Sequence, residues 1–247
     1  MRGLRTLTWI NFKLYIREPV ATFFTLAFPT MLVLLFGAIY GNEPTPMFGG
    51  RGSMDVSLPA YSGLIVGTVG LMSVPMTTAG YREQGILRRL KVTPLRPWTY
   101  ITADQVTNLL ITMLGMVVVS LVGWLMFHIQ FEGQIGAIVI ALVLGTLAMS
   151  ALGYVIASVA STARMAQIIS MVIFYPMIFL SGAGMPGELL PEGIQKVANF
   201  LPLTYVVRLM RGLWFGDSLS DHWLELGVLL GIVLVGGGLA AWLFKWE

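Results

Sequence analysis

Six stretches of this chain are long and apolar enough to cross a lipid bilayer, and this pattern constrains the fold more than any other feature. A membrane-spanning helix needs about 20 consecutive, mostly apolar residues. Helices and closed barrels are the only structures that satisfy every backbone hydrogen bond inside lipid. We therefore predict an all-α integral membrane protein, with a single transmembrane domain over residues 1–247. Its six transmembrane helices are expected at residues 20–40, 58–80, 105–127, 135–160, 166–185 and 224–244.

The composition agrees with a protein whose outer surface faces lipid. Charged residues make up 11% of the chain and apolar residues 56%, whereas soluble domains carry about 25% charged residues. The net charge of +3 is small, and no basic run indicates nucleic-acid binding. The chain has no cysteine and two histidines. We therefore expect no disulfide, metal site or cofactor site within it.

The distribution of Lys and Arg predicts the orientation of the spans. Eleven of the fifteen basic residues precede the first span, follow the sixth, or lie in the loops after the second and fourth spans. The other four lie in the remaining loops. Cytoplasmic loops carry an excess of Lys and Arg. Both termini are therefore expected in the cytoplasm.

Residues 1–19 are amphipathic and too rich in basic residues to span the bilayer. We expect a helix that lies in the cytoplasmic interface. Pro19 ends it, because the residue before a proline is disfavoured in the α conformation. This helix could act as a simple anchor or as a moving part.

The predicted spans carry no ionisable side chain in their interiors, since Asp104 and Glu225 fall at span ends and His128 lies at an interface. Transporters driven by protons or sodium usually place Asp, Glu or His within the bilayer, so ion-coupled transport is disfavoured, as are intramembrane hydrolases with acidic or metal sites. None of the four lysines is followed by Ser or Thr. This excludes the phosphate-binding motif G-x-x-x-x-G-K-[ST], so energy for transport would come from another polypeptide.

A basic amphipathic segment follows the second predicted span, at residues 82–94, and reads R-E-Q-G-I-L-R-R-L-K-V-T-P. Ile86, Leu87 and Leu90 share one face of the expected helix, and basic residues occupy the rest. Pro94 ends it. A loop that only binds anionic lipid would have the same composition.

A proline-rich segment follows the fifth predicted span. Non-helical backbone at membrane depth is tolerated only where protein or water covers it. We therefore expect a re-entrant outer segment over residues 187–223, and an ordinary outer loop with surface helices is the alternative. The residues that mark the break are Ser181, Gly182, Pro186, Pro191 and Pro202.

Small residues predict close contacts between helices. In the second span these are Gly63, Gly67 and Gly70, and in the fourth they are Gly145, Ala148, Ala151 and Gly153.

Taken in order, the two segments resemble the membrane subunits of ABC exporters of the type-2 permease class. That family has an E-x-G-x-[LM]-R-R-L-x-x-[ST]-P-like loop after the second span and an L-S-G…P…L-P…L-P-[LTF]-[TS]-Y…R pattern before the sixth. Arg17-Glu18-Pro19 also matches its R-[DE]-P turn before the first span. The resemblance covers nearly the whole chain, and the loop is most similar to drug and antibiotic exporters of the daunorubicin-resistance type.

The resemblance implies that residues 82–94 form a coupling helix that docks on a separate ATPase subunit, which binds ATP and Mg²⁺. It also implies a second permease copy or a paralogue, and a multi-pass location in a bacterial or archaeal plasma membrane. The docking residues would be Glu83, Gly85, Leu87, Arg88, Arg89, Leu90 and Pro94.

The resemblance places the transport path between the second and fifth spans of paired subunits. Ordinary packing in the core or against lipid would account for the same apolar residues. The candidate lining residues are Met72, Val74, Met76, Met171, Phe174, Met177 and Phe179.

We therefore expect the permease subunit of an ATP-driven exporter for a hydrophobic or amphipathic, drug-like compound, without a catalytic site of its own. One alternative is the same machine exporting a lipid or a lipid-linked glycan. An alternative of another class is a membrane scaffold or sensory subunit that has no transport path.

Overall fold

The computed structural model describes residues 2–46, 50–91, 97–184 and 191–243. The regular elements in these residues are helices, apart from an isolated bridge between Thr45 and Arg51. Six segments are long and apolar enough to cross a membrane. This confirms the prediction of an all-α membrane protein with six spans.

We call these six segments spans one to six. In chain order they are α2–η1–α3 (Pro19–Thr22, Phe23–Ala27, Phe28–Tyr40), α4–η3–α5 (Ser53–Gly67, Thr68–Ser73, Val74–Glu83), α7 (Pro97–Phe127), α8 (Ile135–Val159), α9 (Ala163–Leu180) and η5–α12 (Leu219–His222, Trp223–Leu243). Shorter helices among the described residues are α1 (Arg2–Arg17), α6 (Ile86–Lys91), α10 (Glu192–Ala198) and α11 (Pro202–Trp214). The turns η1 and η3 are π-helical, a local widening that is common at functional sites.

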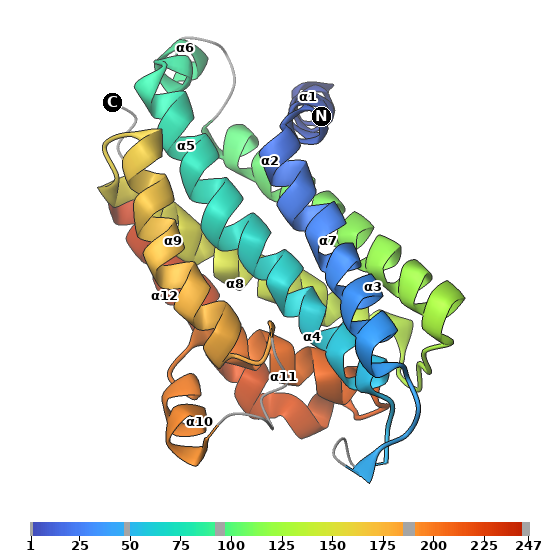
Figure 1. Cartoon of the computed structure of the whole chain (residues 1–247). Coiled ribbons are helices and arrows are strands. Elements are labelled where there is room, and N and C mark those ends of the chain that lie inside the picture. Colours follow the sequence, from blue (N-terminus) through green and yellow to red (C-terminus); the bar gives the residue numbers. More distant parts are fainter. Residues whose placement is uncertain (1, 47–49, 92–96, 185–190, 244–247) are drawn as a thin grey trace.

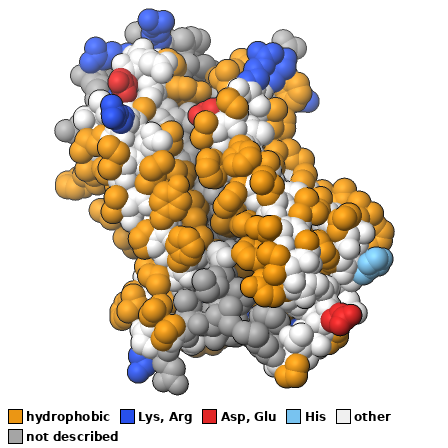
Figure 2. Space-filling model, in the orientation of Figure 1, with side chains coloured by type: hydrophobic (Ala, Val, Ile, Leu, Met, Phe, Trp, Pro, Cys, Tyr) orange, Lys and Arg blue, Asp and Glu red, His pale blue; other side chains and the backbone are white. Residues whose placement is uncertain are grey.

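The short helices divide between the two ends of the bundle. Figure 1 shows α1, α6 and the C-terminal end of α12 at one end, and α10 and α11 at the other. In Figure 2, hydrophobic side chains cover the middle of the visible face, and most of the visible Lys and Arg lie at the end that carries α1 and α6. This distribution suits a protein with an apolar middle in lipid and a basic end in water.

Span two occupies the centre of the bundle. In its most apolar window 89% of the residues are buried, against 22% in span one and 17% in span six. The other spans therefore surround span two and leave their own outer faces exposed.

Small residues let span four approach span two closely, as predicted. A Cβ atom added at Gly153 would lie 2.0 Å from the carbonyl oxygen of Gly70, and one added at Gly70 would lie 2.4 Å from the Cβ of Met149. A Cβ at Gly67 would lie 2.5 Å from Cε2 of Phe174 in span five. Side chains at these positions would push the helices apart.

α11 packs among the span ends rather than on the surface. Val206 lies against Gly145 of span four, and Val207 lies against Gly63 of span two. Its buried apolar side chains are Leu203, Val206, Val207, Leu209, Met210, Leu213 and Trp214. Deep packing of a helix between spans five and six is what a re-entrant segment requires.

The predicted break residues flank the ends of these helices. Ser181 and Gly182 directly follow α9, and Gly182 has a φ of +85°. Pro191 precedes α10, and Pro202 is the first residue of α11, a position where proline costs no helical hydrogen bond. Pro186 lies outside the described residues.

α1 is attached to the bundle along one side. The Thr107 hydroxyl of α7 donates to the carbonyl oxygen of Thr8 at 3.3 Å, and the Tyr15 and Thr25 hydroxyls lie 2.7 Å apart. Tyr15 is buried, whereas the Trp9 side chain on another face of α1 is 59% exposed. A helix with basic residues and an exposed apolar side suits a membrane interface.

The contact between Gly70 and Gly153 predicts that Gly153→Ala destabilises the protein. The new methyl group would meet a backbone oxygen, which cannot rotate away. We therefore expect the free energy of unfolding to fall by about 1–3 kcal/mol. Gly237→Ala is the matched control, because a Cβ there has no neighbour within 4 Å. Thermal unfolding of the purified protein in detergent measures both variants, and equal melting temperatures would contradict the close contact.

Candidate functional site

The chain turns sharply between span two and α6. Gly85 has a φ of +67°, a conformation that glycine adopts without steric cost. A Cβ atom at Gly85 would have no neighbour within 4 Å. Within this chain, the turn itself rather than close packing therefore accounts for the glycine.

α6 presents its two central arginines to the surroundings. Arg88 and Arg89 are exposed, whereas Leu87 is fully buried. The predicted docking residues therefore fall into two groups. Leu87 packs α6 against its own chain, whereas the two arginines remain accessible to a partner. The Leu90 side chain and Pro94 lie outside the described residues.

Arg82 and Glu83, the last two residues of α5, hold the turn between spans four and five. Arg82 Nη2 donates to the carbonyl oxygen of Ala157 at 2.9 Å and also to that of Ala160. Glu83 Oε2 accepts a hydrogen bond from the backbone N–H of Ala163 at 2.9 Å. We call this arrangement the Arg82–Glu83 clamp.

The charges of the clamp match the helix ends that they contact. The C-terminus of a helix carries partial negative charge and exposes carbonyl oxygens, and the N-terminus carries partial positive charge and exposes N–H groups. Arg82 meets the C-terminus of α8, and Glu83 meets the N-terminus of α9. The Thr162 hydroxyl accepts from the N–H of Met165 and caps α9 as well. Span two and the turn are therefore joined by charge-assisted hydrogen bonds.

The predicted role of Glu83 as a docking residue gains a second interpretation from this geometry. Its carboxylate has a partner within its own chain, although the residue remains exposed. The sequence pattern includes Arg82 and Glu83 in the basic segment but does not indicate that they contact Ala160 and Ala163. The adjacent opposite charges at the end of a span were the available signal.

Asp104 corrects one expectation from the sequence. Hydropathy predicts Asp104 at a span end, but the helix that carries it begins at Pro97 and the membrane-length part begins at Thr99. Asp104 is buried inside the bundle, where its Oδ2 accepts from the Tyr154 hydroxyl at 2.6 Å and from Asn108 Nδ2 at 3.1 Å. The carboxylate therefore links spans three and four.

The seven candidate lining residues do not share one environment. Val74, Phe174 and Met177 are buried, and Phe174 packs on Gly67 between spans five and two. Phe179 is 57% exposed. Met72, Met76 and Met171 are half-buried. The structure thus brings spans two and five together within one chain, so that some of the predicted lining, such as Phe174, is internal packing.

Comparison with known proteins identifies relatives over most of the chain. The family model described as ABC-2 type transporter matches residues 2–215. A protein named "Probable multidrug ABC transporter permease YbhR" from Escherichia coli (strain K12) is 29% identical over 183 residues, which are 73% of this chain and 50% of that protein. "Nodulation protein J" from Rhizobium meliloti (strain 1021) is 28% identical over 215 residues, which are 78% of this chain and 79% of that protein. The chain thus spans about half the length of the multidrug permease that it matches.

The clamp predicts a local effect of Glu83→Ala. Removing the carboxylate leaves the first N–H of α9 without its partner, so we expect the local stability of the start of α9 to fall by about 1 kcal/mol. Hydrogen–deuterium exchange should become faster in the peptide that contains Ala163. Gln84→Ala, a change at the next exposed residue, should leave this exchange unchanged. Equal protection in Glu83→Ala and in the unaltered protein would show that the bond is unimportant.

Proposed function

This chain belongs to the ABC-2 type transporter family, and we propose that it is the membrane permease subunit of an ATP-driven exporter. The observation that carries the proposal is the attachment of α6 to the bundle. α6 presents Arg88 and Arg89 at the end of the most buried span. The clamp joins that same end to spans four and five.

In this proposal a separate ATPase subunit binds ATP and Mg²⁺ and moves α6. The guanidinium groups of Arg88 and Arg89 would form bidentate pairs with carboxylates of that subunit. Leu87 is buried and a single turn separates α6 from span two, so a displacement of α6 acts directly on the central span. The clamp carries the same displacement to spans four and five.

We propose a hydrophobic or amphipathic, drug-like substrate, moved along a path between this chain and a second copy or a paralogue. Support comes from α9, which contacts span two through Phe174 and leaves Val172 and Phe179 exposed on other faces. The word "multidrug" in the name of the Escherichia coli relative favours the same substrate class. The complex would lie in a bacterial or archaeal plasma membrane.

Charge reversal on α6 tests the proposal. In Arg88→Glu/Arg89→Glu we expect loss of the ATPase subunit that co-purifies with the unaltered chain, and ATP-dependent uptake of a hydrophobic dye by reconstituted vesicles reduced roughly tenfold or more. Lys196→Glu is the control, because Lys196 is exposed on α10 at the opposite end. A double variant that retains both partner and uptake would refute coupling through α6.

The proposed orientation predicts an asymmetric labelling pattern. The natural chain has no cysteine, so a single introduced thiol reports its own location. In intact cells Lys196→Cys should react with a membrane-impermeant maleimide, whereas Arg89→Cys should react only after the cells are opened, because the end with more Lys and Arg faces the cytoplasm. The reverse pattern would overturn the orientation.

A further inference from the structure

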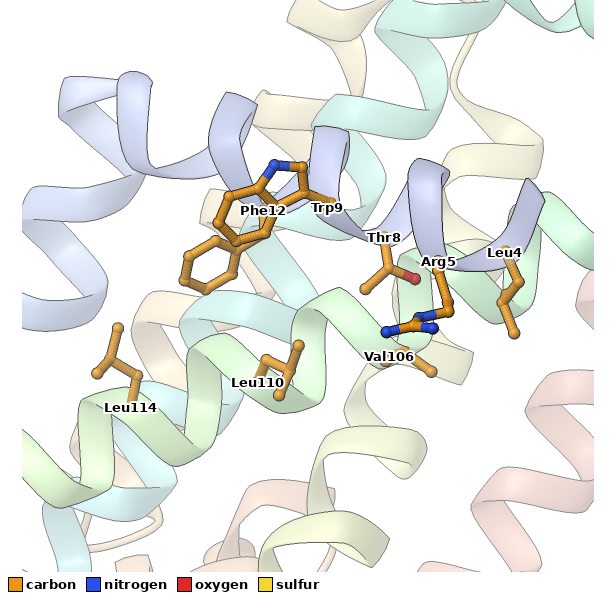
Figure 3. Close-up of a pocket in the computed structure, with 8 residues that line it drawn as sticks. All are labelled: Leu4, Arg5, Thr8, Trp9, Phe12, Val106, Leu110 and Leu114. Carbon is orange, nitrogen blue, oxygen red and sulfur yellow. The ribbon is translucent and has the colours of Figure 1, made fainter. Parts of the chain in front are cut away.

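A groove of about 500 Å³ runs between α1 and α7. Figure 3 shows that it is bounded by one face of α1 above and by a stripe of α7 below. The stripe consists of Val106, Leu110 and Leu114, spaced four residues apart and therefore aligned along one side of the helix. These apolar side chains are 36%, 45% and 36% exposed in the same order.

The groove has one polar end. Figure 3 shows the Arg5 guanidinium and the Thr8 side chain directed from α1 into the space above Val106, whereas the surroundings of Leu110 and Leu114 are apolar. None of the ion pairs between described residues includes Arg5. A positive charge and a hydroxyl group thus meet at the start of an apolar channel.

From this juxtaposition we propose that the groove binds one anionic phospholipid of the leaflet in which α1 lies. An acyl chain lies along the α7 stripe, and the headgroup phosphate binds Arg5 and Thr8. A guanidinium group matches phosphate geometry with two parallel hydrogen bonds. The Trp9 ring, 59% exposed at the rim, lies where amphipathic aromatic rings prefer the boundary between headgroups and acyl chains.

Charge favours an anionic lipid over a second copy of this chain. The sixteen residues of α1 include four basic residues and no Asp or Glu. Symmetric pairing of two copies through this face would bring like charges together. An anionic headgroup brings the opposite charge, and Arg5 is the basic residue of α1 that lines the groove.

The position of the groove also suits a lipid. α1 is fixed to α7 at Thr107 and to η1 at Thr25. The groove lies beside those attachments, and the exposed Trp9 is among its lining residues. Water in such an apolar space would find few hydrogen-bond partners. An acyl chain covers the exposed leucines without that cost.

Native mass spectrometry of the protein in detergent tests this proposal. The probes are phosphatidylglycerol and phosphatidylcholine with identical acyl chains, added in separate titrations. We expect one phosphatidylglycerol site with higher affinity than any phosphatidylcholine site. Arg5→Ala should weaken that site at least about fivefold, because the phosphate loses a charge-assisted hydrogen bond from the guanidinium group.

Two further variants separate this site from general effects of charge and folding. Arg17→Ala removes the same side chain from the far end of α1, where Arg17 is exposed, and should leave the affinity unchanged. Leu110→Trp fills the groove and should reduce the binding of phosphatidylglycerol without removing a charge. Equal affinity for the two lipids, or equal weakening by Arg5→Ala and Arg17→Ala, would overturn the proposal. So would unchanged binding in Leu110→Trp.

Discussion

The contact between Gly70 and Gly153 sets the distance between spans two and four, and the arrangement of the other spans depends on it. In lipid the transfer of apolar side chains from water no longer drives helix association. Close van der Waals packing therefore contributes a larger part of the free energy of association. Here the Gly70 carbonyl oxygen occupies the space that a side chain at Gly153 would need. Spans four and five and α11 can then all reach span two, through Gly70, Gly67 and Gly63 respectively.

The Arg82–Glu83 clamp connects the end of the central span to its neighbours, a connection that the proposed transmission of movement from α6 would require. Both residues lie in the last turn of α5, directly before the turn that leads to α6. One side chain binds the end of α8 and the other binds the start of α9. Because the two contacts flank a short turn, a displacement of α5 acts on both helices at the point where they join.

The sequence predicted the helical class and the number of spans, because hydropathy depends on the length of apolar runs and not on packing. It also predicted the close contacts of Gly63, Gly67, Gly70, Gly145 and Gly153. The predicted start of the third span at residue 105 was too late, because Asp104 lowers the hydropathy of the preceding residues even though it hydrogen-bonds inside the bundle.

The internal partners of the Arg82–Glu83 clamp could not be found from the sequence. Glu83 and Ala163 are joined by a hydrogen bond although they lie 80 residues apart in the sequence. Periodicity cannot indicate such a contact, because it describes only neighbours along one helix. The burial of Leu87 and the exposure of Arg88 fit an amphipathic α6. Which of those faces meets the bundle is decided by tertiary packing.

The buried and exposed sides of α9 indicate which of its residues could line the proposed path between two copies of the chain. Phe174 and Met177 pack inside the chain, whereas Val172, Tyr175 and Phe179 are 69%, 45% and 57% exposed. Side chains that already fill the contact with span two cannot line a path without opening that contact. If two copies meet along α9, the exposed side chains would therefore reach a substrate first, and Phe179 alone of these three was among the predicted lining residues. Exposure after folding, rather than apolar character, distinguishes the residues that could line the path from those that hold α9 in place.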